Sequence, residues 1–445
     1  MGPLPKHQTK VLPGIPGRPG VLLLLLLTCS AEMVAQSSAI DSIRRVIATA
    51  KVDTTRLAAM IALSEHIYTV DPDTNLIICR DVLHRADAAL KKSGLEPKEH
   101  SALLRIQATA VNNMAVSHFI FGELDSALAC FQRAQALHEV NGSAAGAADA
   151  LNNQGIVYEA QGNHAEQRRC LFSALHAYER AKDQANTGTA LNNIGNYFAA
   201  RGRPDSALAY LDSSLKVFTG LKDQQGIANS LLNIGRFFEE TGKPAEALER
   251  YLECERIYTE QGDDRSLAVC YNNIASIYKD QGILEESIGY LHRALDIHLE
   301  QGDKLGEANV RMNIGTALDD QGELDMALEE FDKSLAIYRG SGDRTGEALI
   351  HGHIGNVWKN KGDRPKALEH LHASLAISRG IDSPDEISTA LYKLGHYHED
   401  VGEFDSALAH YEECLAVEQR TLDKESGSVH PIQHRRPEAE AGKSG

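Results

Sequence analysis

Apolar and small residues recur every 40 residues along most of the chain, from about residue 103 to residue 420. Eight successive units fit this spacing without an insertion or a deletion. Three series carry the pattern: Gly155, Gly195, Gly235, Gly315, Gly355 and Gly395; the unbroken series Gly122, Gly162, Gly202, Gly242, Gly282, Gly322, Gly362 and Gly402; and Ala-Leu pairs beginning at 127, 207, 247, 327, 367 and 407. Such a fixed period is typical of a solenoid, in which each unit packs only on its neighbours.

Within one unit the apolar positions predict two helices. Residues 191–198 carry apolar side chains three and four positions apart, which places them on one helix face. Gly202 is expected to end this helix, because glycine readily adopts the positive φ of a helix C-terminus. Pro204 suits the first turn of a second helix, which we expect over residues 205–218.

Small residues predict how the helices meet and how the units join. Gly195 in the first helix and Ala207 in the second allow the two helices of a unit to approach closely. Between units, Gly302 can end one helix while Asp303 caps the next. One such helix pair cannot bury its apolar faces alone, so we expect the units to stack on one another.

A glycine in the first helix, an aromatic residue three positions later and an Ala–large apolar pair in the second helix together resemble the tetratricopeptide repeat. Where present, the aromatic residue is Tyr158, Phe198, Phe238, Tyr278 or Trp358. The family unit has about 34 residues, so these 40-residue units are more similar to the long-unit branch of kinesin light chains and polarity adaptors. The resemblance implies an all-α fold, a right-handed α-solenoid (superhelix) of stacked helix-turn-helix repeats.

The pattern divides the chain into four parts. We expect a signal peptide and leader over residues 1–35, a degenerate N-terminal repeat or cap over 36–102, eight tandem repeats over 103–422, and a disordered tail over 423–445. In the degenerate repeat, helices are predicted at about 57–68 and 77–90. Terminal repeats of such arrays are often atypical because they shield the end of the stack.

The leader has the layout of a secretory signal peptide, with basic residues ahead of a short apolar run at 21–27. Small residues at Ala31 and Ala35 supply cleavage sites, so we expect an exported chain, periplasmic or extracellular in a bacterium. Cys29 offers the alternative of a lipoprotein. Its preceding residue, Thr28, departs from the usual small residue of a bacterial lipobox.

Charge and cysteine content narrow the functional classes. A formal net charge of −17 repels phosphate backbones, which argues against nucleic-acid binding. Besides Cys29 the chain has six cysteines: Cys79, Cys130, Cys170, Cys254, Cys270 and Cys414. Because several occupy equivalent positions in different units, we interpret them as small core residues. Cys254 and Cys270 are the one pair for which a disulfide is worth testing.

The strongest functional signal is a row of asparagines two positions before the glycine or alanine of the first helix. The row comprises Asn113, Asn153, Asn193, Asn233, Asn273 and Asn313, and it ends at His353 and Lys393. Asn193 points away from Leu191 and is therefore expected outside the core. An amide offers both a donor and an acceptor to a peptide backbone. In the family an asparagine at this place commonly clamps a bound extended segment, which the resemblance implies here; the alternative is bonding between neighbouring helices.

A second signal is negative charge on the same face of the first helices. The acidic residues are Glu239, Glu240, Asp280, Asp319, Asp320, Glu399 and Asp400. Together they favour a basic partner, although ordinary solvated helix ends would look the same. We include Glu240, Asp320 and the amide of Asn196 among the candidate peptide-binding residues.

Histidines gather in the last two units, at His351, His353, His370, His372, His396, His398 and His410. Metal-chelating pairs on a helix need spacings of three or four, which His-x-His does not provide. We therefore predict no metal site and no cofactor. Nothing resembles a phosphate loop, a zinc-peptidase motif or a nucleophile elbow, so we predict no enzyme and no catalytic residues.

Two functions fit the sequence. The first is a scaffold or adaptor that binds an extended peptide or a helix in the concave groove, placed on about residues 103–320. The second is a sensory input module of a bacterial signalling system, of the histidine kinase, cyclase or transcription-regulator type, that lacks its effector domain. Exported arrays of this kind resemble the receptor parts of such proteins.

Overall fold

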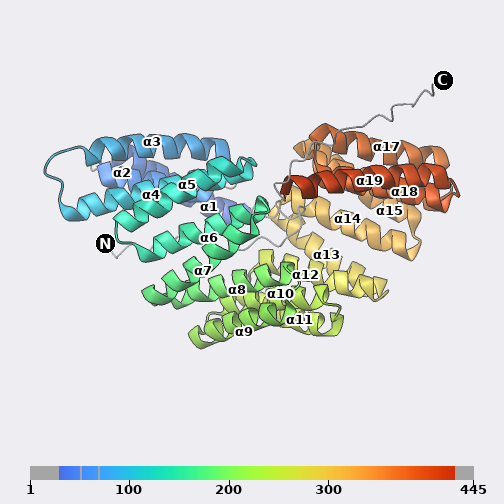
Figure 1. Ribbon diagram of the computed structural model, residues 1–445, viewed down its shortest axis with the longest axis horizontal. Coiled ribbons are helices and arrows are strands. Elements are labelled where there is room, and N and C mark those ends of the chain that lie inside the picture. The colour runs from blue at the N-terminus through green and yellow to red at the C-terminus, as the bar shows by residue number, and fades with distance from the viewer. Residues whose placement is uncertain (1–29, 51–52, 69–70, 426–445) are drawn as a thin grey trace, which may run out of the picture.

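A computed structural model describes residues 30–50, 53–68 and 71–425 of the protein. Residues 1–29 of the expected leader, including Cys29, lie outside the described residues, whereas residues 30–35 belong to the first helix. In the described part the chain forms 19 helices and no strand. Figure 1 shows them following one another along a curved path, from α1 at the blue end to α19 at the red end. The predicted all-α solenoid is confirmed.

Three helices precede the eight regular units, and each unit then contributes a first and a second helix. The leading helices are α1 (Ser30–Thr49), α2 (Asp53–Ile67) and α3 (Pro72–Leu90). The first helices are α4 (Pro97–Ile120), α6 (Ala144–Ala160), α8 (Gln184–Ala200), α10 (Gln224–Glu240), α12 (Asp264–Asp280), α14 (Lys304–Gln321), α16 (Arg344–Asn360) and α18 (Pro384–Asp400). The second helices are α5 (Leu124–Val140), α7 (His164–Ala181), α9 (Pro204–Leu221), α11 (Pro244–Gln261), α13 (Leu284–Gln301), α15 (Leu324–Ser341), α17 (Arg364–Ile381) and α19 (Phe404–Glu425).

The predicted helix ends form as their local chemistry requires. Gly202 has a φ of 61° after α8, and Pro204 occupies the first turn of α9. Between units, Gly302 ends α13 with a φ of 64°, and the Asp303 carboxylate accepts a 2.9 Å hydrogen bond from the Gly306 amide. This cap satisfies one of the free amides at the start of α14.

Close packing within a unit explains the glycine of the first helix. A Cβ at Gly195 would lie 2.6 Å from Leu211 Cγ and 3.2 Å from the Ala207 oxygen. Ala207 and Leu211 are both fully buried. Any side chain at Gly195 would therefore push α8 away from α9, as the small-residue pattern predicted.

The joint between units depends on a second glycine contact. The Phe218 ring, near the end of α9, lies against Gly226 at the start of α10 and leaves no room for a Cβ there. One unit later the larger Tyr258 has the position of Phe218, and Ser266 has the position of Gly226. Two units after Phe218, His298 again lies against a glycine, Gly306.

The second, fourth and sixth units also share a tyrosine hydrogen bond, whereas the eighth has Glu418 at that position. Tyr178 donates to Asp149 at 2.7 Å, Tyr258 to Asn229 at 3.1 Å, and Tyr338 to Asn309 at 2.6 Å. The intervening units have Phe218, His298 and Ser378 at the tyrosine position. The array therefore has an 80-residue period superimposed on the 40-residue one.

The two ends of the array test the predicted boundaries. α2 and α3 occupy the segment expected to form a degenerate repeat, and the Asp71 side chain caps α3 by accepting from the Thr74 amide at 3.0 Å. The expected disordered tail began too early, because α19 includes residues 423–425. The rest of that segment lies outside the described residues.

The first helices form the inner face of the curve. α2 packs on α4, α8 on α10, and both α14 and α18 pack on α16. Second helices of neighbouring units make no comparable contact in the part of the chain that the structure describes. Because elements on the inside of a bend lie closest together, the first helices line the concave side. Among the described helices, none is long and apolar enough to cross a membrane.

Candidate functional site

The asparagine row lies on the concave first helices, and several of its amides bond to the preceding unit. Asn153 donates to Asn112 at 3.3 Å, and Asn193 donates to Asn152 at 2.8 Å. At the start of the row, Asn113 donates to Ser64 of α2 at 2.9 Å. The amide therefore joins consecutive first helices.

These three amides are also buried. The exposed fractions are 4% for Asn113, 1% for Asn153 and 8% for Asn193. The expectation that Asn193 lies outside the core is wrong, because the side chain of the preceding unit covers it. We call Asn113, Asn153 and Asn193 the closed rungs. Their main contribution is to hold units together, since a buried amide without its partner is costly.

The other three asparagines are more accessible, and we call Asn233, Asn273 and Asn313 the open rungs. Asn233 and Asn273 are half-buried, and Asn313 is exposed. Asn313 donates to Asn272 at 3.2 Å, and Asn233 accepts from Asn196 at 3.4 Å. Asn273 makes no side-chain hydrogen bond within the described residues, because the position that would pair with it is Leu232.

The structure divides the acidic strip into engaged and exposed groups. Engaged carboxylates accept from neighbouring side chains: Glu239 from Tyr251 and Ser276, Asp319 from Asn360, Glu399 from Tyr411, and Asp400 from Lys359. Glu240, Asp280 and Asp320 are exposed at the ends of α10, α12 and α14. These last three carboxylates are open to solvent, although Asp280 lies 3.9 Å from the Lys279 amine.

A histidine and a lysine, His353 and Lys393, continue the row after the last asparagine. The His353 ring stacks on Phe331 with centroids 5.5 Å apart. Burial, with the charges of Lys393 and Lys279, lowers the pKa of His353 to about 3. Burial also lowers the pKa of Lys393 to about 8. A Cβ at Gly352 would lie 2.7 Å from the Lys393 amine, so the lysine occupies the space where earlier units have an asparagine.

Five other histidines of the cluster contact side chains of the protein: His351, His370, His396, His398 and His410. His351 and His370 face each other with their Nδ1 atoms 2.9 Å apart, and Arg339 donates to His351 at 3.0 Å. Burial and the charges of His370 and Arg339 lower the pKa of His351 to about 4. His398 contacts Glu403. No group of three potential metal ligands is found among the described residues.

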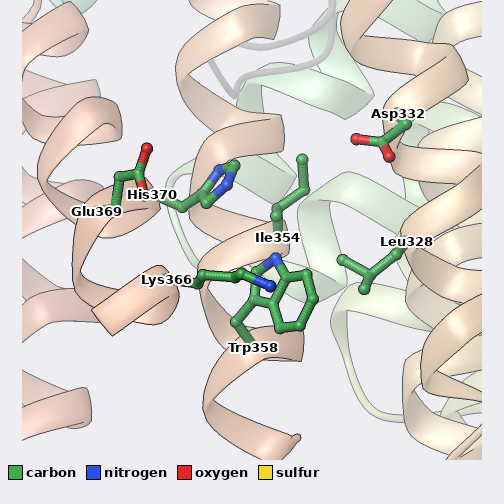
Figure 2. Close-up of a pocket in the computed structure, with 7 residues that line it drawn as sticks. All are labelled: Leu328, Asp332, Ile354, Trp358, Lys366, Glu369 and His370. Carbon is green, nitrogen blue, oxygen red and sulfur yellow. The ribbon is translucent and has the colours of Figure 1, made fainter. Parts of the chain in front are cut away.

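A pocket of 290 Å³ lies among α15, α16 and α17. Figure 2 shows its lining residues, which are Leu328, Asp332, Ile354, Trp358, Lys366, Glu369 and His370. The Lys366 amine lies 3.9 Å from the centre of the Trp358 ring, as a cation–π contact. His370 is already paired with His351, so two of the polar groups in this pocket, Lys366 and His370, contact other side chains of the protein.

The bonding between units was missed at the sequence level, although a signal was present. Three of the bonded rungs follow another asparagine directly, as Asn-Asn pairs at 112–113, 152–153 and 192–193. Neighbouring residues on a helix point about 100° apart, so one amide of a pair faces forward and the other back along the array. A repeated Asn-Asn pair therefore indicates amide contacts between units.

The sequence profile of the tetratricopeptide repeat matches residues 106–185, 186–260, 266–340 and 346–420. The chain belongs to the tetratricopeptide repeat family. Each match covers two of the 40-residue units, consistent with the 80-residue period of the tyrosine bonds. This fold generally serves as a non-catalytic scaffold for protein interactions. No curated protein matches the sequence significantly.

Several solved structures share the fold. The apo form of the quorum sensor NprR from B. thuringiensis is 14% identical, covers 87% of this chain and 99% of its own, and gives a TM-score of 0.55. Aspartyl phosphate phosphatase F from Bacillus subtilis is 12% identical, with 86% and 98% covered and a TM-score of 0.54. A signal transduction ATPase with a tetratricopeptide repeat sensor from Pyrococcus horikoshii is 15% identical, with 81% and 56% covered and a TM-score of 0.54. At these identities the likeness shows the fold alone.

Proposed function

We propose that the protein is an interaction scaffold that binds an extended polypeptide segment along α10, α12 and α14. The open rungs Asn233, Asn273 and Asn313 supply the amides that bond to the ligand backbone. The observation that carries this proposal is Asn273, a half-buried amide on the concave face with no side-chain partner among the described residues. A peptide backbone offers the donor and the acceptor that this amide lacks.

The spacing of the helices suits an extended ligand. α10, α12 and α14 follow one another without the close contact that α8 makes with α10, so their axes are at the upper end of the spacing of packed helices, about 10 Å. An extended chain advances about 3.3 Å per residue. One rung therefore meets roughly every third residue of the ligand, and three rungs cover a segment of about seven residues. An extended segment leaves its backbone groups unpaired, so an amide on every third residue adds affinity without requiring one sequence.

We propose that the ligand segment is basic. Glu240, Asp280 and Asp320 place one exposed carboxylate beside each open rung. Exposed charges contribute modest affinity and are screened by salt. The preference should therefore weaken as ionic strength rises.

The test uses two matched triple variants of the full chain. Asn233→Ala, Asn273→Ala and Asn313→Ala together alter the open rungs, and the same change at Asn113, Asn153 and Asn193 alters the closed ones. Peptides are first selected on the wild-type protein from a displayed random library, and their Kd is then measured by fluorescence anisotropy. We expect the open-rung variant to lose at least about 10-fold in affinity, or about 1.4 kcal/mol, with nearly unchanged melting.

The closed-rung variant should melt lower while its remaining folded fraction binds normally. The proposal is wrong if the open-rung variant binds the selected peptides as tightly as the wild type does. It is also wrong if the closed-rung variant loses affinity while its fold is intact.

The alternative function is a sensory input module, and the fold shared with NprR and with the sensor-bearing ATPase supports it. A sensor must change shape on binding, whereas an adaptor need not. Small-angle scattering of the free and peptide-saturated chain separates the two. A clear change in the radius of gyration favours the sensor, and an unchanged radius favours the adaptor.

We also propose that the chain is exported, with lipidation at Cys29 as the variant form. Fractionation of bacteria expressing the full chain should place it outside the cytoplasm. Incorporation of a labelled fatty acid that is lost with Cys29→Ala would establish the lipid anchor.

A further inference from the structure

The joint between α11 and α12 contains two cysteines, and we infer that Cys254 and Cys270 are a disulfide-forming pair. The bond would form when the chain folds under oxidising conditions. It would join two consecutive units covalently. This inference does not depend on the proposed function.

The preceding unit shows how close the two positions lie. Ser214 and Ser230 occupy the equivalent places, 40 residues earlier in each case, and their hydroxyl oxygens are 3.1 Å apart. Both serines are fully buried. Because the units repeat in register, Cys254 and Cys270 direct their sulfurs toward each other across the same joint.

The surroundings of the two sulfurs place them at one junction. Cys270 Sγ donates a 3.0 Å hydrogen bond to the backbone carbonyl oxygen of Tyr251. Tyr251 lies one turn before Cys254 on α11. Cys254 Sγ donates to the Ala228 oxygen of α10 at 3.3 Å. Both residues are fully buried in the core shared by α10, α11 and α12.

No other joint presents two thiols. The equivalent pairs in later units are Ala294 with Val310, Ser334 with Ile350, and Ser374 with Ala390. Among the remaining cysteines, Cys79 contacts Ser64 and Cys414 contacts the Ser388 oxygen. The pair is therefore specific to the joint between the fourth and fifth units.

The reaction is an ordinary thiol–disulfide exchange with a small disulfide such as oxidised glutathione. One cysteine thiolate attacks the glutathione disulfide and releases one reduced glutathione. The second cysteine then attacks the mixed disulfide and releases the other. Two thiol protons are lost, two electrons pass to glutathione, and one sulfur–sulfur bond forms in the protein.

Burial makes the timing of this reaction important. The hydrogen bond with Cys270, together with burial, raises the pKa of the Cys254 thiol, so little thiolate exists in the folded state. Oxidant cannot reach either sulfur once α11 and α12 have packed. The folded protein should therefore keep whichever state, dithiol or disulfide, it had when it folded.

The bond would act where the ligand groove is proposed. α10 carries Asn233 and α12 carries Asn273, and α11 lies between them in the chain. A link from α11 to α12 limits how far these first helices can separate. The curvature of the groove at this joint would then be held by a covalent bond in addition to side-chain packing.

The test is refolding of the full chain from denaturant with either reduced or oxidised glutathione, followed by non-reducing peptide mass mapping. We expect oxidative refolding to give one protein disulfide, between Cys254 and Cys270, and a melting temperature higher by roughly 2–6 °C. The same oxidant added to the folded, reduced protein should give no such bond over several hours.

Two variants provide matched controls. Cys254→Ser with Cys270→Ser reproduces the serine pair of the preceding unit, so it should fold normally and show no shift in melting between the two refolding conditions. Adding Ser214→Cys with Ser230→Cys to this variant should move the disulfide one unit earlier.

The inference is overturned if oxidative refolding leaves Cys254 and Cys270 as thiols or links either of them to another cysteine. It is equally overturned if both residues are recovered only as glutathione adducts. If the double serine variant fails to fold, the mapping of the wild-type chain alone decides the question.

Discussion

The closed and open rungs contain the same residue in the same register, yet their surroundings give them different roles. Asn193 is 8% exposed and donates to Asn152 of the preceding unit. Asn273 is half-buried and faces Leu232, which offers no acceptor. For these two rungs the residue 41 positions earlier, an asparagine in one case and a leucine in the other, decides whether the amide holds two units together or remains available. Identical positions in a repeat need not share a function.

The largest expected effect is on stability, and it separates the two classes of rung. Asn193→Ala removes a buried hydrogen bond and leaves Asn152 without its partner, which should cost about 1–3 kcal/mol. Asn273→Ala removes no side-chain hydrogen bond within the described residues, so its effect should stay within about 0.5 kcal/mol. Urea unfolding followed by circular dichroism measures both. If both variants lose the same free energy of unfolding, closed and open rungs do not differ in their contribution to stability.

A smaller effect is expected when an open rung is converted into a closed one. Leu232→Asn places an acceptor opposite Asn273 and should weaken peptide binding by roughly 3- to 10-fold, about the worth of one hydrogen bond. Leu232→Ala is the control, since it removes the same side chain without supplying an acceptor. If both variants bind equally well, the availability of Asn273 is not what matters.

The stability contributed by the end of the row, at His353, should depend on pH, whereas the stability contributed by the asparagine rungs should not. Burial and the nearby lysines lower the folded pKa of His353 to about 3, below its unfolded value near 6.5. The unfolded chain then binds more protons, so the stability contributed by neutral His353 is lost as the pH falls from about 6.5 toward 3. His353→Asn, which restores the rung residue, should reduce this slope in melting experiments between pH 7 and 5. An unchanged slope would assign the effect to other histidines such as His351.

The smallest expected effect concerns the exposed carboxylates. Asp320→Asn should weaken binding of a basic peptide by about 0.3–1 kcal/mol at low salt, and the difference should fade at higher ionic strength. Asp319→Asn is a useful comparison, because Asp319 already accepts a hydrogen bond from Asn360. If peptide affinity depends on salt equally in both variants, the exposed carboxylates are not the groups that attract the basic peptide.

The fold could be predicted from the sequence because its rules are local or strictly repeated. Gly202, Pro204 and Asp303 act within one turn of their own position, and each behaves as its chemistry requires. The close approach at Gly195 also follows from the spacing of two helices in one unit.

The candidate site was only partly predictable because it depends on contacts between units. The sequence identified the asparagine row but not that Asn152 would cover Asn193. In the same way, Glu239 looked like a free charge until Tyr251 and Ser276 were found to donate to it. Which side chain reaches across a joint depends on the angle between units, which no single unit specifies.

The glycine found at some joints but not at others limits how evolution or an engineer can shorten the protein. Removing one unit, residues 224–263, would bring Phe218 against Ser266, whose Cβ would occupy the space that Gly226 leaves free for the ring. Removing two units, residues 224–303, would bring Phe218 against Gly306 and recreate the native kind of joint. Removing three units, residues 224–343, would likewise bring Phe218 against a glycine, Gly346. Viable truncations at this joint are therefore those of 80 or 120 residues, which place a glycine against Phe218, and not those of 40 residues.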